Sequence, residues 1–297
     1  LFRSLPLENL PAPELRWAPS GRHFALCSRQ RVELRGADDG ALAGAYDVPA
    51  ATTLADCSFR PQGGALAVLQ ADGVIVFLDA RSLAVHATAG AAEHGPDRLA
   101  WSSDGSFVAA WRRGGGHVTV LDAVRGAVLR ALATDLPANS VVVGAGGHQL
   151  VIGGVQGEVR AYDLGTGTAR QLREAGPDRA VVAIDPSGTR AAFASHGDIH
   201  YAELFVVGRA VSVSAIARPT PSHPRVLGDP NRAFAFIVAS GLYAFSRDGL
   251  HLVGRDGGGE PFFLPDRARF ILGDGKVLDA DGHAVLPVPE EQLLLEA

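Results

Sequence analysis

Residues 99–122 read LAWSSDGSFVAAWRRGGGHVTVLD, and this stretch holds the unit that decides the fold. An aromatic anchor, Trp101, is followed by a turn that ends at Gly105, an apolar run, a glycine-rich turn and a second apolar run that ends in Asp122. Ser, Asp and Gly favour tight turns, because the short side chains bond back to the backbone and Gly accepts a positive φ. Short apolar runs between such turns predict β-strands. The stretch therefore predicts three consecutive strands of an antiparallel sheet.

The same unit recurs along the whole chain. The anchors and the turn residues four positions after them are Trp17/Gly21, Phe59/Gly63, Trp101/Gly105, Val143/Gly147, Ile184/Gly188, Leu227/Asn231 and Phe263/Arg267. Successive anchors lie 42, 42, 42, 41, 43 and 36 residues apart. A period of about 40–45 residues with four short strands is typical of propeller blades. The sequence therefore predicts an all-β fold, a seven-bladed β-propeller with four antiparallel strands per blade, which we name a, b, c and d in chain order.

The repeat also sets the expected boundaries. The propeller is predicted over residues 12–288, with repeats near 12–52, 53–94, 95–136, 137–178, 179–222, 223–258 and 259–288. Residues 1–11 are expected to supply an N-terminal strand that closes the ring, with Phe2 to Leu5 either latching onto the seventh repeat from outside or replacing 284–288 as its outer strand. Residues 289–297 form an acidic, leucine-rich tail.

An acid after an apolar residue ends four of the predicted c strands: Leu78-Asp79, Leu121-Asp122, Tyr162-Asp163 and Leu278-Asp279. With the turn glycines and the period, this pattern resembles the WD-repeat family of β-propellers over residues 12–288. The tryptophan of the Trp-Asp pair is absent, and no repeat opens with the Gly-His pair of that family, although His94-Gly95 stands there in reversed order. The chain thus resembles a divergent, bacterial member. The resemblance implies binding of proteins or peptides, with the b–c and d–a loops on one face and the a–b and c–d loops on the other.

Composition narrows the class of function. The chain has 297 residues, a net charge of −5 and 47% hydrophobic residues. This balance argues against nucleic-acid or anionic-membrane binding, since both need a dominant basic surface. We find no nucleophile elbow, no zinc-protease helix, no paired-cysteine motif and no phosphate loop. We therefore expect a non-catalytic protein without metal or cofactor.

The two cysteines leave two interpretations open. Cys27 lies in strand b of the first repeat and Cys57 in strand a of the second, both among apolar neighbours. Free Cys is among the most buried residue types, so we expect buried free thiols in preference to a disulfide. With no signal-peptide pattern at the start, we expect a cytoplasmic protein. The chain contains no Met, and we interpret it as a monomeric domain cut from a larger protein.

The candidate binding residues lie on two b–c turns. Trp111, Arg112 and Arg113 precede a run of three glycines in the third repeat, and Arg29 and Arg31 occupy the same turn of the first. Trp and Arg are enriched among interface hot spots, and arginines bind carboxylates in bidentate fashion. The alternative is a solvated turn whose arginines cover apolar surface or pair with Asp72 and Asp198. We expect these five residues to bind an acidic peptide or protein.

Other patterns carry weaker expectations. His196 and His200 have the i, i+4 spacing of metal ligands, but a third ligand is missing, so we interpret them as structural. The segment from Asp279 to Glu290 resembles a calcium loop, yet His283 and Ala284 stand where an oxygen ligand and a glycine are needed. The segment Arg218–Pro224 holds three prolines and predicts an exposed loop that is a second candidate contact.

Three functions remain open from the sequence. The first is a protein-protein interaction scaffold that binds a peptide or protein on one face of the propeller. The second is a small-molecule-binding or hydrolytic propeller enzyme with a site at the channel mouth, although no catalytic residues recur at the repeat period. The third is a structural domain of a larger scaffold, docked through the leucine-rich tail. We favour the first.

Overall fold

The computed structural model describes residues 13–90, 95–176 and 179–184 and, beyond them, the strands bounded below. The chain divides into two compact units, which are described separately. The first comprises residues 1–138 and 145–147, and the second comprises residues 139–144 and 148–297.

The first unit contains three four-stranded antiparallel sheets, each formed by strands consecutive in the chain. The first sheet comprises β1 (Glu14–Trp17), β2 (His23–Cys27), β3 (Arg31–Gly36) and β4 (Leu42–Asp47). The second comprises β5 (Leu54–Phe59), β6 (Ala65–Gln70), β7 (Ile75–Asp79) and β8 (Val85–Ala89). The third comprises β9 (Arg98–Trp101), β10 (Phe107–Trp111), β11 (His117–Asp122) and β12 (Val128–Ala133). A short 3-10 turn, η1 (Ala145–Gly147), also belongs to this unit.

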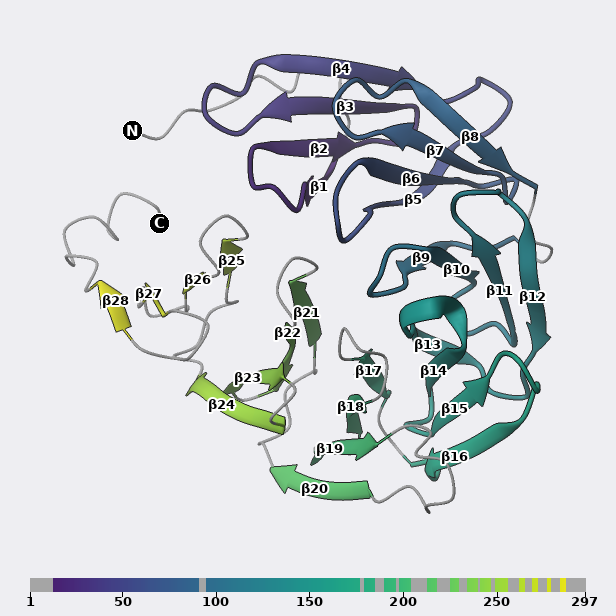
Figure 1. Cartoon of the computed structure of the whole chain (residues 1–297), viewed down its shortest axis with the longest axis vertical. Coiled ribbons are helices and arrows are strands. Elements are labelled where there is room, and N and C mark those ends of the chain that lie inside the picture. The colour runs from purple at the N-terminus through teal and green to yellow at the C-terminus, as the bar shows by residue number, and fades with distance from the viewer. Residues whose placement is uncertain are drawn as a thin grey trace. The chain divides into compact units, whose positions relative to one another are not determined.

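The second unit repeats the pattern. Its first sheet comprises β13 (Ala138–Val143), β14 (Gln149–Gly154), β15 (Val159–Asp163) and β16 (Ala169–Arg173). The later described strands pair in the same order: β17 (Val181–Ile184), β18 (Arg190–Ser195), β19 (Asp198–Glu203) and β20 (Val213–Ala217), then β21 (Arg225–Asp229), β22 (Phe234–Ala239), β23 (Gly241–Ser246) and β24 (Gly249–Arg255), then β25 (Phe262–Leu264), β26 (Arg269–Ile271), β27 (Val277–Leu278) and β28 (Ala284–Leu286). For the residues that the structure describes, the prediction of an all-β fold of four-stranded antiparallel sheets is confirmed. In Figure 1 the strands carry these labels.

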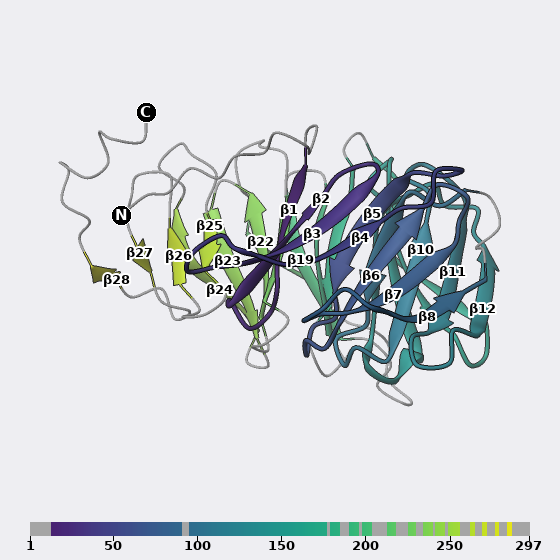
Figure 2. The same ribbon diagram turned by 90° about the horizontal axis from the view of Figure 1, so that it is seen from above.

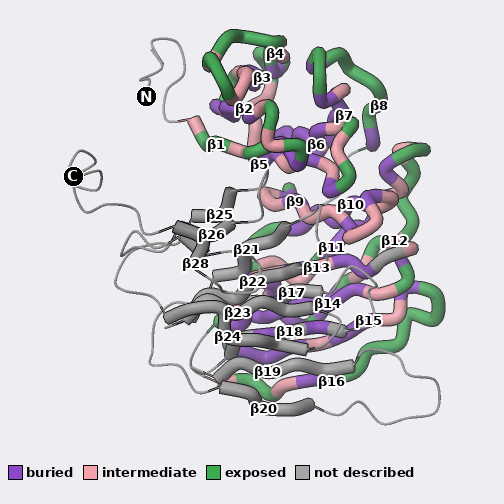
Figure 3. Tube along the Cα trace, turned by 60° about the vertical axis from the view of Figure 1, so that its left-hand side comes forward, coloured by how far each residue is buried: buried purple, intermediate pink, exposed green. Residues whose placement is uncertain are grey.

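Burial follows the position of a strand in its sheet. Strand β6 has the sequence ALAVLQ and is buried over five of its six residues, whereas the outer strand β4 alternates between exposed and half-buried residues. Figure 3 shows the same contrast between β6 or β7 and the largely exposed β4, β8 and β12. Alanine and valine suit the inner positions, because small side chains let neighbouring sheets approach closely. Figure 2 shows β6, β7 and β8 running beside one another, as their register requires.

The turn glycines adopt the backbone conformation that the sequence predicts. Gly21, Gly63, Gly105 and Gly147 have φ between 66° and 77°. Other residue types rarely adopt this region, since a Cβ atom then crowds the backbone. The spacing of anchor and glycine therefore marks the a–b turn correctly in all four repeats in which that turn is described.

Three of the four strand-ending aspartates accept hydrogen bonds from the turn that follows them. Asp79 accepts hydrogen bonds from the backbone N–H groups of Arg81 and Ser82 and from the Ser82 hydroxyl, at 2.9–3.0 Å. Asp122 and Asp163 accept the equivalent bonds in their own turns. These bonds lower the pKa values of Asp79 and Asp163, because each favours the ionised carboxylate. Asp279 lies outside the described residues.

Side chains of the inner strands tie neighbouring repeats together. Arg16 Nε donates to the Cys57 carbonyl and Trp101 Nε1 to the Ser58 carbonyl, across sequence separations of 41 and 43 residues. In the second unit Asn139 Nδ2 donates to the Ala180 carbonyl across 41 residues. These separations match the repeat period, so equivalent strands of successive repeats lie side by side.

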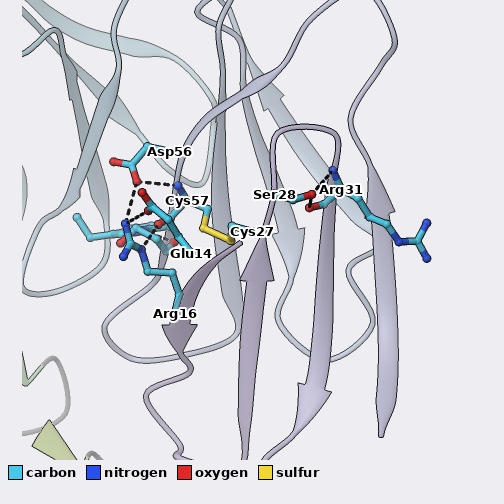
Figure 4. Close-up of a disulfide and its surroundings, with 9 residues drawn as sticks. Glu14, Arg16, Cys27, Ser28, Arg31, Asp56 and Cys57 are labelled. Atoms are coloured by element: carbon cyan, nitrogen blue, oxygen red, sulfur yellow. Dashed lines mark hydrogen bonds and ion pairs between the residues drawn. A yellow bond between two sulfur atoms is a disulfide. The ribbon is translucent and has the colours of Figure 1, made fainter. Parts of the chain in front are cut away.

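The expectation of free thiols is wrong. Cys27 and Cys57 form a disulfide across 30 residues, between β2 of the first sheet and β5 of the second. Their Cα atoms lie 6.8 Å apart, and both residues are buried, at 3% and 1% exposure. Figure 4 shows the bond, with Arg16 and Asp56 nearby. The two cysteines belong to different repeats, and only the packing of one sheet on the next brings them together.

Several predictions fall outside the described residues. These are the N-terminal strand at 1–11, the tail at 289–297, the loop Arg218–Pro224, His196 and the segment from Asp279 to Glu290. Strand β28, which ends the last predicted repeat, covers Ala284–Leu286. The described part of the chain contains no helix long and apolar enough to cross a bilayer.

Candidate functional site

The b–c turns and the d–a connections lie at the same edge of the sheets and are bonded to each other. In the first sheet, the amides of Val48 and Leu54 donate to the carbonyls of Gln30 and Arg29 at 2.8 Å. In the third sheet, the Gly114 amide donates to the Ala138 carbonyl, and the Ala138 amide donates to the Gly115 carbonyl. We call this surface the b–c edge. Its turns are held by backbone bonds, so a partner would meet loops of fixed geometry.

Three of the predicted arginines are exposed on the b–c edge. Arg29 lies between β2 and β3, and Arg112 and Arg113 lie between β10 and β11. Within the described part of the chain, no carboxylate forms an ion pair with any of these three guanidinium groups. The backbone at Arg113 is fixed, since its amide donates to Asp97 Oδ1 at 2.9 Å. Rigid backbone and uncommitted guanidinium groups are what the capture of an anion requires.

Arg31 belongs to a different environment from the other predicted arginines. Its NH1 group lies 2.6 Å from Asp47 Oδ1, and its Nε lies 3.2 Å from Glu33 Oε1. Arg35 binds the other oxygen of the buried Glu33 at 2.6 Å. The hydrogen bond to Asp47 is the main cause that raises the pKa of Arg31 above its ordinary value. Arg31 is thus committed to a charge network on β3 and β4, and the prediction that its guanidinium is available needs correction.

Trp111 also differs from the expectation. It is the last residue of β10, pairs with Val118 of β11 and is only 6% exposed. Its indole Nε1 is buried and has no hydrogen-bond partner among the described residues. The run of glycines that follows suggested a turn residue, but strand b is buried to its end. In this structure Trp111 is a core residue of the third sheet, so the exposed part of the predicted cluster consists of Arg112 and Arg113.

The histidines show no metal centre where they are described. His117 is exposed at the start of β11, and His200 belongs to β19. Among the described residues, no group of three or more His, Cys, Asp or Glu side chains is arranged to hold a metal ion.

Sequence reasoning missed a buried carboxylate on the inner strands. A bulge between Leu54 and Asp56 in β5 turns Asp56 toward the neighbouring repeat. Its Oδ2 accepts a bond from the Leu99 amide at 2.9 Å, and its Oδ1 accepts one from the Cys57 amide at 2.8 Å. Arg16 NH2 lies 3.4 Å from Oδ1 (Figure 4).

The electrostatics of Asp56 are those of a buried group. Burial raises its pKa above the ordinary value, while the bonds from Leu99 and Cys57 and the charges of Arg16 and Arg98 act in the opposite direction. A carboxylate with a raised pKa is a candidate general base. Both oxygens of Asp56 are occupied by donors from the protein, however, so its role is to join β5 to β9.

Comparisons with known proteins establish the fold alone. No protein-family model and no curated protein matches the chain. Among solved structures, a chain of a mitotic checkpoint complex aligns at a TM-score of 0.63 and 16% identity, covering 95% of this chain and 94% of that one. A chain of Kuenenia stuttgartiensis hydrazine synthase aligns at 0.56 and 16% identity, covering 81% and 78%.

These likenesses support four-stranded sheets of the propeller type, with a WD40 propeller among the structural neighbours. Matches extend to 1767 solved chains, so the fold is shared too widely to select one function.

Proposed function

We propose that this protein is a non-catalytic binding module that captures an acidic segment of a partner protein on its b–c edge. The observation that carries the proposal is the set of three exposed arginines, Arg29, Arg112 and Arg113, which have no ion pair within the described residues and lie on loops held by backbone bonds. Rigid loops lose little conformational entropy on binding.

The proposal is tested by reversing charge at this edge. Arg112→Glu with Arg113→Glu should remove the salt-sensitive binding of a fluorescent octaglutamate peptide, measured by anisotropy, and should release the same set of partners in affinity capture read by mass spectrometry. The matched control is Arg81→Glu with Arg170→Glu, which makes the same change of charge at two exposed positions away from the b–c edge. Unchanged binding in the first variant, or equal loss in both, would remove the b–c edge from consideration.

An enzymatic function is the alternative, and Asp56 is the observation that favours it. Its raised pKa and the nearby arginines Arg16 and Arg98 are features of catalytic carboxylates. The two backbone donors on its oxygens favour the binding module instead, because a general base needs a free oxygen for the proton it receives. A hydrolytic activity that Asp56→Asn abolishes without unfolding the protein would reverse this preference.

We also propose that the sheets close as a seven-bladed propeller. The support is the seven recurring anchors and the four-stranded sheets out to β28. Leu15 and Trp17 of β1 are 47% and 41% exposed, and closure would cover these apolar side chains with a neighbouring sheet. A sheet in a closed propeller has neighbours on both faces. Small-angle X-ray scattering should give a radius of gyration of about 19 Å, the value for a compact chain of this length. A clearly larger value for the monomer would contradict closure.

The disulfide between Cys27 and Cys57 is relevant to the cellular compartment in which the protein works. Disulfides persist in oxidising compartments and are rare in the cytosol. We therefore propose that the protein works in an oxidising compartment, in place of the cytoplasm that the sequence had suggested. Protein isolated from its natural source with thiols blocked at lysis should show no free Cys27 or Cys57 by mass spectrometry. Recovery of both as blocked thiols would support the cytoplasmic assignment.

A further inference from the structure

The first unit has a pocket at the edge opposite to the b–c edge, between its second and third sheets. Its volume is about 200 Å³, and it is lined by the ends of β7 and β9, by Ala65 of β6 and His86 of β8, and by the turns that follow β5, β9 and β11. Arg60, Phe77, Asp79, His86, Trp101 and Val124 are among the lining residues. We call it the β5/β9 pocket.

One wall of the β5/β9 pocket is aromatic and rigid. The rings of Phe77 and Trp101 meet edge to face, with centroids 5.8 Å apart. The Trp101 indole N–H donates to the Ser58 carbonyl at 2.9 Å, which fixes the ring and leaves only its apolar surface for a ligand. Val124, 66% exposed, also lines the pocket, in the turn between β11 and β12. Large exposed apolar side chains beside a hollow favour contact with another molecule.

Two side chains of opposite charge, Arg60 and Asp79, line the pocket and differ in their hydrogen bonds. Arg60 Nε is buried and has no hydrogen-bond partner within the part of the chain that the structure describes. The Arg60 side chain packs against Gly105, where an added Cβ would fall 2.7 Å from that Nε atom. The lining carboxylate, Asp79, is engaged by its own turn, where Oδ1 accepts three hydrogen bonds. Arg60 therefore lines the pocket while its buried Nε lacks an acceptor, and a buried donor without a partner is costly.

The size of the pocket limits the occupant. Small-molecule sites usually measure about 300–1,000 Å³, and an engineered cavity of about 150 Å³ holds one benzene molecule. A pocket of about 200 Å³ therefore takes one or two side chains and not a large ligand.

We propose that the β5/β9 pocket binds an extended segment of a partner protein, in which an acidic side chain pairs with Arg60 and an adjacent hydrophobic side chain packs on Phe77 and Trp101. The acidic group supplies the acceptor that Arg60 lacks, and the apolar group covers the ring surfaces beside it. This site is separate from the b–c edge, because it lies at the other end of the same strands.

The test uses two peptides, acetyl-Ser-Glu-Phe-Ser-amide and its counterpart with Gln in place of Glu. Binding is followed by the NMR shift of the Trp101 indole N–H, assigned by comparison with Trp17→Phe and Trp111→Phe. The Glu peptide should bind about tenfold more tightly than the Gln peptide, since bonds to charged groups are the stronger ones. Arg60→Gln should abolish this difference, whereas Arg81→Gln, at an exposed arginine of the neighbouring turn, should preserve it.

A second variant protects the test against misfolding at Arg60. Val124→Glu changes an exposed side chain and should weaken binding of the Glu peptide by repulsion. No shift of Trp101 with either peptide, or an unchanged preference for Glu in Arg60→Gln, would overturn the proposal. Binding of free 3-phenylpropionate without binding of the Glu peptide would also overturn it, because the ligand would then be a small carboxylate. None of these variants touches Arg29, Arg112 or Arg113, so the two binding proposals fail or hold separately.

Discussion

The junction between the first and second sheets differs in chemistry from the junction between the second and third. The first is covalent, since Cys27 of β2 is bonded to Cys57 of β5. The second is held without a disulfide, by Asp56 accepting from the Leu99 amide and by Trp101 donating to the Ser58 carbonyl. Both junctions align inner strands of consecutive repeats. A regular repeat therefore fixes where its sheets must meet and leaves open which atoms join them.

The largest effect is expected from breaking the covalent junction. Cys27→Ala with Cys57→Ala should lower the free energy of unfolding by about 3–4 kcal/mol, because a disulfide that closes a loop of 30 residues restricts the unfolded chain. Urea unfolding with and without dithiothreitol measures this effect. The double variant should be insensitive to the reductant. An oxidised wild-type protein whose midpoint does not move on reduction would show that the bond adds no stability.

The next largest loss of stability is expected from breaking the non-covalent junction between the second and third sheets. Asp56→Ala removes the acceptor of two buried amides, those of Leu99 and Cys57, and should cost about 2–3 kcal/mol. Asp97→Ala is the matched control, since Asp97 also accepts a backbone bond, from Arg113, but in an exposed loop. Urea midpoints of the two variants give the comparison. Equal losses of stability in the two variants would mean that the buried bonds to Asp56 stabilise the protein no more than an exposed bond does.

A smaller loss of stability is expected from the c–d turns, which lie at the edge opposite to the b–c edge. Asp79→Ala removes the acceptor of three hydrogen bonds, but the carboxylate is close to solvent, so the expected loss is about 1 kcal/mol. Asp122→Ala removes the equivalent acceptor in the next sheet and should behave alike. A loss larger than that of Asp56→Ala would mean that these turns hold the sheets more firmly than the buried junction does.

The sequence predicts best what depends on neighbours along the chain. The a–b turn glycines and the strand-ending aspartates act within a few residues of themselves, and the structure shows both where they are described. The disulfide and the Asp56 tie depend on contacts between repeats, which no local pattern reveals. The pairing partners of Cys27 and Asp56 become visible only when one sheet lies against the next.

The burial of Trp111, in contrast, could be predicted from its position in the repeat. Counting back 42 residues from Trp111 gives Leu69, and 42 more gives Cys27. All three end a b strand or lie next to its end, and all three are buried. Its position in the repeat therefore marks Trp111 as a core residue, whereas its glycine-rich neighbours suggested a turn. Arg112 and Arg113, one and two positions later, lie beyond the strand and are exposed.

The smallest effect, and the sharpest contrast between a buried and a solvent-facing carboxylate, is in the pH dependence of stability. The pKa of Asp56 is raised by burial and that of Asp79 is lowered by its turn, both from an ordinary value of 3.8. The contribution of Asp56 is thus complete below about pH 4 and is lost as the pH rises through its folded value, whereas that of Asp79 is complete above about pH 4 and is lost as the pH falls. The free energy of unfolding of Asp56→Asn and Asp79→Asn is measured between pH 2 and 8 and compared with that of the wild type. Relative to the wild type, Asp56→Asn should become more stable as the pH rises toward neutral, and Asp79→Asn should become more stable as the pH falls. Slopes of the same sign would mean that one of these two carboxylates has its environment misassigned.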